Sequence, residues 1–126
     1  MPKIDVPKDP ERERKLKAFD NLLTIMDELR VNCPWDRKQT FESLRYLTIE
    51  EVYELSDGIL DHDLEEIKKE LGDLMLHLVF YSKIASEKKA FDIGDVLENI
   101  CNKLIHRHPH VYGDEDAEDE EKVKQN

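Results

Sequence analysis

Glycine and proline are scarce in this chain of 126 residues, which contains four glycines and five prolines. Folds made of many short strands need frequent turns, and these two residues are among those that most often supply them. Their scarcity argues against a turn-rich all-β fold and favours long helices joined by short connections.

Long apolar runs are also missing. No stretch approaches the roughly 20 apolar residues that a membrane-spanning helix needs, and the charged residues 1–14 lack the apolar core of a secretory signal. The two cysteines, Cys33 and Cys101, do not form a Cys-x-x-Cys pair. We therefore expect a cytoplasmic protein with reduced thiols and no membrane partner.

The chain has few positive charges relative to negative ones. It contains 19 Lys and Arg residues and 30 Asp and Glu residues, which give a net charge of -11. Such a charge repels nucleic acid and anionic membranes, so nucleic acid is not expected as a partner. The length indicates one domain. We expect an extended lead over residues 1–10, a helical domain over residues 11–112 and an acidic tail over residues 113–126.

Apolar residues recur with helical spacing in four segments, which predict helices over residues 11–31, 40–60, 64–88 and 92–108. Pro34 breaks the first pattern, while Thr40 and Asp63 are candidate N-caps for the second and third helices. The expected fold is all-α, an antiparallel four-helix bundle. Residues 71–85 are apolar nearly all round, which predicts burial on every side and a bundle completed by dimerisation.

Acidic residues form two short patterns inside the second and third predicted helices. The patterns are Glu-Glu-x-x-Glu and Glu-x-x-Asp, formed by Glu50, Glu51, Glu54, Glu70 and Asp73. Glu51 falls in the middle of the apolar face of its helix, and a carboxylate pointing into an interior needs a counter-charge. A hard divalent cation takes oxygen ligands, so the pattern predicts Mg2+, with Mn2+ as the alternative. A merely solvated acidic face is the competing interpretation.

Three segments in order carry a family resemblance. They are the segment Cys33-Pro34-Trp35-Asp36 with Gln39-Thr40, then the acidic pattern, and then residues 103–111. In these segments the chain resembles the MazG-type, all-α nucleoside triphosphate pyrophosphohydrolases. The resemblance covers about residues 12–126 and looks like the first of two domains in longer members. It implies antiparallel helices in a homodimer or higher homo-oligomer. It also implies Mg2+-dependent hydrolysis of a nucleoside triphosphate to the monophosphate and pyrophosphate, which would clear aberrant or surplus nucleotides.

The resemblance also implies roles for individual acids. The metal ligands map onto Glu51, Glu54, Glu70 and Asp73. The catalytic residues map onto Glu50, Glu51 and Glu54. Glu50 is less securely a direct ligand, and we expect it to support a ligand or to orient the attacking water.

Substrate contacts follow from the other two segments. Lys103 and Arg107 are four residues apart, so they share a helix face, and by similarity they bind phosphate oxygens. Trp35 is a candidate to stack on the base, although a lone Trp is more often a core residue, and Asp36 and Gln39 are further candidates to contact the nucleotide.

A non-enzymatic function remains the alternative. A helical dimerisation or regulatory domain of a longer tandem protein could bind metal or nucleotide without turnover. The sequence does not specify the preferred base and sugar, the number of ions or the phosphorus that is attacked.

Overall fold

The computed structural model describes residues 4–113 of the chain, and every regular element in that range is a helix. The helices are α1 (Arg12–Asn32), α2 (Pro34–Lys38), α3 (Phe41–Leu60), α4 (Leu64–Glu87), α5 (Ile93–Arg107) and α6 (Pro109–Tyr112). The all-α prediction is confirmed. The acidic tail expected over residues 113–126 lies outside the described residues except for Gly113.

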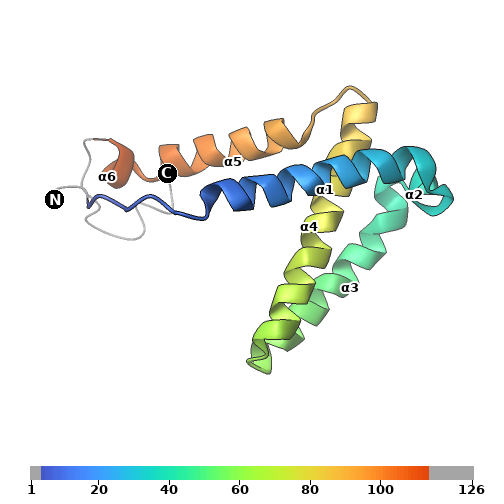
Figure 1. Cartoon of the computed structure of the whole chain (residues 1–126), viewed down its shortest axis with the longest axis horizontal. Coiled ribbons are helices and arrows are strands. Elements are labelled where there is room, and N and C mark those ends of the chain that lie inside the picture. The colour runs from blue at the N-terminus through green and yellow to red at the C-terminus, as the bar shows by residue number, and fades with distance from the viewer. Residues whose placement is uncertain (1–3, 114–126) are drawn as a thin grey trace. The chain divides into compact units, whose positions relative to one another are not determined.

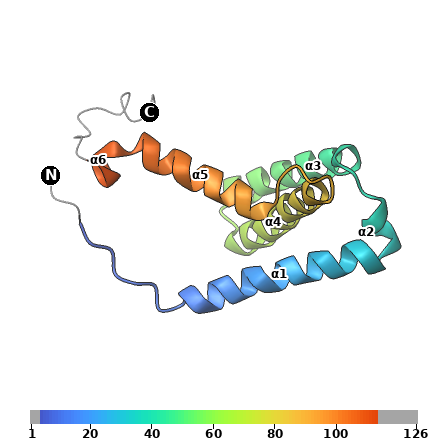
Figure 2. The ribbon, with the colours of Figure 1, turned by 90° about the horizontal axis from the view of Figure 1, so that it is seen from above.

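The chain divides into two compact units. One unit is Glu11–Asp92 and contains α1 to α4, while the other combines Met1–Pro10 with Ile93–Asn126 and contains α5 and α6. Within the first unit, α3 and α4 lie side by side and antiparallel, joined by a tight turn at their far end (Figures 1 and 2).

Two polar caps fix the ends of this helical hairpin. The Thr40 hydroxyl accepts a hydrogen bond from the Ser43 amide, and the Ser43 hydroxyl accepts one from the Thr40 amide. The Asp63 carboxylate accepts a hydrogen bond from the Glu66 amide at the start of α4. These are the donors that a helix start otherwise leaves unpaired, so both caps predicted from the sequence are confirmed.

The core lies where α1 packs against the C-terminal part of α4 and the N-terminal part of α3. Its buried residues are Met26, Leu44, Val79, Phe80 and Ile84. The ring of Phe41 stacks on that of Tyr81, with centroids 6.0 Å apart. Burial of side chains this large is the main favourable term in folding, so this end of the helical hairpin anchors the unit.

Arg30 ties α1 to both α2 and α4. Its guanidinium donates to the Glu87 carboxylate over 2.8 Å and to the backbone carbonyls of Asp36, Arg37 and Gln39. It also lies 5.8 Å from the centroid of the Phe80 ring. One side chain therefore holds the short α2 segment in place through its backbone oxygens.

The burial predicted for residues 71–85 is only partly correct in the single chain. Val79, Phe80, Ile84 and Ala85 are buried, but Leu71 remains 53% exposed, as does about half of Leu78. The buried apolar side chains of this stretch are therefore concentrated in its C-terminal half. Among the described residues, no helix is long and apolar enough to cross a membrane.

The second unit contains one long amphipathic helix. Apolar side chains of α5, among them Val96, Ile100 and Leu104, are partly exposed. His108 ends this helix by donating from its Nδ1 to the carbonyl oxygen of Leu104. Pro109 then begins the four-residue helix α6.

Candidate metal and active site

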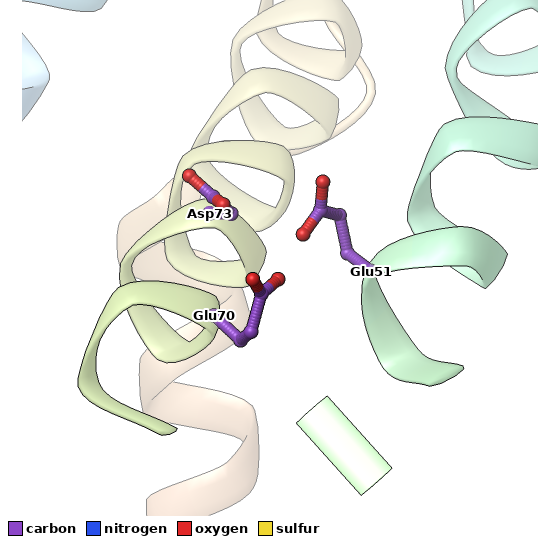
Figure 3. A group of neighbouring side chains, drawn as sticks. All are labelled: Glu51, Glu70 and Asp73. Atoms are coloured by element: carbon purple, nitrogen blue, oxygen red, sulfur yellow. The ribbon is translucent and has the colours of Figure 1, made fainter. Parts of the chain in front are cut away.

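Three of the five acidic residues converge between α3 and α4. One carboxylate oxygen from each of Glu51, Glu70 and Asp73 lies within 4.8 Å of the other two. Figure 3 shows Glu51 reaching from α3 toward Glu70 and Asp73 on α4. Oxygen ligands at this spacing match what a hard divalent cation takes.

The local sequence brings the two helices close together beside this cluster. Gly58 on α3 is buried, and a Cβ atom there would lie 3.3 Å from Cγ of Glu66 on α4. The missing side chain allows α3 and α4 to approach near their turn. Glu51 lies two turns earlier on the same side of α3, so its carboxyl group enters the seam between the helices.

Three carboxylate oxygens at this place have no hydrogen-bond partner. Glu70 is fully buried, and both of its oxygens, together with Oε2 of Glu51, are buried without a donor. The ammonium group of Lys69 forms an ion pair at 3.5 Å from Glu70 Oε1, but its side chain is 65% exposed. Buried carboxylates without partners are costly. The donor set therefore fits a divalent cation, which supplies the missing positive charge.

Glu51 and Glu70 lie close enough to shift each other's pKa in opposite directions. The neighbouring Glu70 carboxylate, which accepts a hydrogen bond once Glu51 is protonated, raises the pKa of Glu51 to about 8, and burial and the charges of Glu70, Asp73 and Glu54 act in the same direction. The same contact with Glu51 holds the pKa of Glu70 below its usual value, despite burial.

Glu54 and Glu50 lie outside this group of three. Glu54 is exposed on α3, yet it is near enough to contribute to the pKa shifts of both Glu51 and Glu70. Glu50 is exposed, and its carboxylate lies beside the Tyr46 hydroxyl, where hydrogen bonding and charge raise the pKa of Tyr46. Glu54 thus borders the cluster, and Glu50 faces another direction. Their roles as ligand and catalytic residue stay predictions.

The α2 residues proposed to bind nucleotide occupy different environments. Trp35 is 54% exposed, so it is not a core residue in the single chain, and Asp36 is half-buried. The side chain of Gln39 donates to the Trp35 carbonyl and accepts from the Ser43 hydroxyl. Gln39 therefore has a structural role here, and all three nucleotide contacts stay predictions.

Lys103 and Arg107 are exposed on α5, one turn apart. They belong to the second unit. Their proposed contacts with phosphate oxygens stay a prediction.

The sequence analysis missed two parts of this region. Glu66 lies next to Glu70, which raises the pKa of Glu66. Thr48 and His77 form a polar pair across the seam, with Tyr81 as a third member. The available signal was the antiparallel pairing of the helices, because residues 48 and 77 lie opposite each other in a hairpin whose turn is centred near residue 62.

The chain is similar to known proteins in sequence and in fold. Residues 39–112 match the model of the MazG nucleotide pyrophosphohydrolase domain. A nucleoside triphosphate pyrophosphohydrolase of Escherichia coli K12 is 43% identical over 111 residues, covering 86% of this chain and 42% of that protein. A nucleoside triphosphate pyrophosphohydrolase/pyrophosphatase MazG of Thermotoga maritima is 50% identical over 98 residues, covering 76% of this chain and 38% of that protein.

A solved structure shares the fold. The crystal structure of a mazG-related protein from Thermotoga maritima aligns with a TM-score of 0.71 at 24% identity, covering 84% of this chain and 92% of that one. The chain spans less than half the length of the curated relatives described above. The family model matches more than half of the chain and includes all five acids of the pattern, so the chain belongs to the MazG nucleotide pyrophosphohydrolase domain family.

Proposed function

We propose that this chain hydrolyses nucleoside triphosphates to nucleoside monophosphates and pyrophosphate, using a divalent cation such as Mg2+ held by Glu51, Glu70 and Asp73. The observation that carries the proposal is the group of buried oxygens of Glu51 and Glu70 that have no donor. Relatives named as nucleoside triphosphate pyrophosphohydrolases support the reaction class.

The chemistry divides between the cation and the side chains. When bound, the cation polarises phosphoryl oxygens and lowers the pKa of water. Glu51, Glu70 and Asp73 would hold the cation, and Glu51 would have to lose its proton to serve as a ligand. Glu54 is exposed beside this set and is proposed as a fourth ligand.

The remaining steps concern the triphosphate. Water adds to phosphorus, the anhydride bond between the α- and β-phosphates breaks, and pyrophosphate leaves. Glu50 is proposed to orient the water and accept its proton. In the single chain its carboxylate lies beside Tyr46, so this role requires the side chain to turn toward the cluster when substrate binds. Lys103 and Arg107 are proposed to stabilise the charge on the phosphate oxygens, because positioning and charge stabilisation supply most of the catalysis in phosphoryl transfer.

The biological setting is part of the same proposal. A cytoplasmic homodimer or higher homo-oligomer that removes aberrant or surplus nucleotides fits the reaction. Large side chains such as Leu71 and Leu78 are about half exposed in the single chain, which supports burial against a second copy.

Pyrophosphate release from a panel of ribo- and deoxyribonucleoside triphosphates tests the proposal, with Mg2+ and with EDTA. Glu70→Gln should abolish turnover and the Mg2+-dependent rise in melting temperature, because it removes the charge of a buried ligand. Glu65→Gln is a matched control on the same helix, since the Glu65 side chain is 84% exposed and forms an ion pair with Lys68.

The alternative is a metal- or nucleotide-binding regulatory domain of a longer protein. It is favoured by one fact, which is that the chain spans only part of its relatives. Nucleotide binding without any pyrophosphate release, by folded protein that binds Mg2+, would establish that alternative and overturn the enzymatic proposal.

A further inference from the structure

A network of three polar side chains crosses the seam between α3 and α4 next to the acidic cluster. The hydroxyl oxygen of Thr48 lies 2.8 Å from Nδ1 of His77 and also contacts the hydroxyl of Tyr81. His77 is buried, while Thr48 and Tyr81 are partly buried. Thr48 is three residues before Glu51, and His77 is four residues after Asp73. The network is therefore one helical turn from the proposed ligands on both helices.

The hydrogens of this network have an arrangement in which the Thr48 hydroxyl both donates and accepts. The Thr48 hydroxyl has one hydrogen, and it lies 3.1 Å from the carbonyl oxygen of Leu44, which can only accept. We assign this hydrogen to the bond with Leu44, so that Thr48 accepts from both Tyr81 and His77. In this arrangement His77 carries a hydrogen on Nδ1. Burial lowers the pKa of His77, and the charge of Asp73 partly opposes this effect. Every polar atom of Thr48 is satisfied.

The partners of Thr48 are themselves held in place. The ring of Tyr81 stacks on Phe41 at an interplanar angle of 16°, and His77 lies on the turn of α4 that precedes Tyr81. A rigid acceptor on α3 that receives two hydrogen bonds from α4 resists both sliding and separation of the two helices. Satisfied buried networks of this kind fix one arrangement among several that apolar contacts alone would allow.

We propose that Thr48, His77 and Tyr81 are positioning residues that set the distance between Glu51 on α3 and Glu70 and Asp73 on α4, and thereby select a small divalent cation such as Mg2+. This inference rests on the metal centre proposed above. It assigns the selection of ion size to uncharged side chains that do not contact the ion.

Ion size gives the inference its specific test. Mg2+ requires nearly ideal octahedral geometry at about 2.0–2.1 Å, whereas Ca2+ accepts flexible geometry at about 2.3–2.6 Å. A loosened seam should therefore weaken Mg2+ binding much more than Ca2+ binding. A residue with a merely structural role would lower fold stability without changing the ratio of the two affinities.

The experiment is calorimetric titration of the full chain with Mg2+ and separately with Ca2+, without nucleotide. Thr48→Val keeps the side-chain shape but removes the acceptor, so Mg2+ affinity should fall about tenfold or more, while Ca2+ affinity changes little. Thr48→Ser keeps the hydroxyl and should retain the wild-type ratio. Tyr81→Phe removes one hydrogen bond, keeps the stacked ring and should give an intermediate ratio.

Ile84→Val is the matched control, because it removes one methylene from the buried core without altering the network. It should leave the ratio of Mg2+ to Ca2+ affinity unchanged. Nitrogen-15 NMR of His77 should show the hydrogen on Nδ1 in the wild-type protein. The inference is overturned if Thr48→Val leaves the ratio of Mg2+ to Ca2+ affinity unchanged, whether or not both affinities fall. It is also overturned if His77 carries its hydrogen on Nε2 alone.

Failure of this inference is distinguishable from failure of the proposed function. Wild-type protein that binds neither ion would overturn the metal centre and the positioning role together. An unchanged ratio in Thr48→Val, with wild-type turnover intact, would overturn the positioning role alone. Absence of turnover with a changed ratio would leave the positioning role supported and the hydrolase proposal rejected.

Discussion

The two ends of the α3–α4 seam differ in how completely their polar groups are satisfied. At the end near α1, Leu44 is buried among apolar side chains, and the Thr48 hydroxyl uses all its hydrogen-bonding capacity. At the end near the turn, Glu51 and Glu70 leave buried oxygens without donors. The same pair of helices thus has one region that stabilises the fold and one whose buried carboxylates carry a desolvation cost.

The largest expected effect comes from the satisfied end. Leu44→Ala should lower the free energy of unfolding by about 2–5 kcal/mol, because it opens a cavity in the core. Urea denaturation without metal measures the change. Glu51→Gln, a substitution at the unsatisfied end, should instead leave metal-free stability at pH 8 equal or higher. A loss of stability in Glu51→Gln comparable to that of Leu44→Ala would remove the distinction between the two ends.

Arg30 is a partly buried cation with several hydrogen-bond partners. Its removal should lower the stability of the fold, as the removal of Leu44 should. The Arg30 side chain is 14% exposed, and it binds Glu87 and three backbone carbonyls. Arg30→Ala should cost about 1–3 kcal/mol, because Glu87 is partly exposed and water replaces some of the lost bonds. Thermal unfolding measures this loss. The loss should persist in saturating Mg2+, and a loss that Mg2+ abolished would contradict a purely structural role for Arg30.

The unsatisfied end should show an unusual dependence on pH. The pKa of Glu51 is raised to about 8 in the folded chain, whereas it is close to 4.5 when unfolded. Between these values the folded state holds a proton that the unfolded state has lost, so stability falls as pH rises, by at most about 1.4 kcal/mol per pH unit for one proton. The contribution is fully present below pH 4.5 and lost above pH 8.

Denaturation of metal-free protein at a series of pH values measures this slope, and Glu51→Gln is the control that should flatten it. Mg2+ affinity should rise over the same pH range, because binding must displace the proton. Mg2+ affinity that did not change between pH 6 and pH 8 would show that Glu51 is already ionised.

The smallest effect is expected for the exposed cation beside the cluster. Lys69 forms ion pairs with Glu66 and Glu70, but its side chain is 65% exposed. Lys69→Gln should tighten Mg2+ binding, because it removes a positive charge that repels the cation. The gain should be less than about fivefold, since interactions between exposed charges are weak and screened. The gain should shrink at high salt in a calorimetric titration. Weaker Mg2+ binding in Lys69→Gln would mean that Lys69 helps to organise the ligands.

The sequence predicted the long helices well, because their apolar periodicity is strong and two of them have clear caps. Thr40 and Asp63 cap α3 and α4 as expected. The sequence also placed Glu51 inside the seam, since it interrupts an apolar face. The direction of Asp73 could not be inferred, because the apolar residues of α4 surround most of the helix and define no single face.

Short elements and long-range pairs were beyond the sequence pattern. Pro34 ended the first periodic segment, but the structure uses it as the first residue of the five-residue helix α2, where its fixed φ is favourable. One helical turn contains too few residues to show periodicity. The Thr48–His77 hydrogen bond joins residues 29 positions apart, so only the folded hairpin makes them neighbours.

The attachment of α2 has a consequence for substitutions within this segment. Arg30 holds the segment through the carbonyl oxygens of Asp36, Arg37 and Gln39, and carbonyl oxygens are present whatever side chain the position carries. Trp35, which projects with 54% of its surface exposed, can therefore be exchanged without releasing the anchor. A segment fixed by its main chain keeps its position when its exposed side chains are substituted.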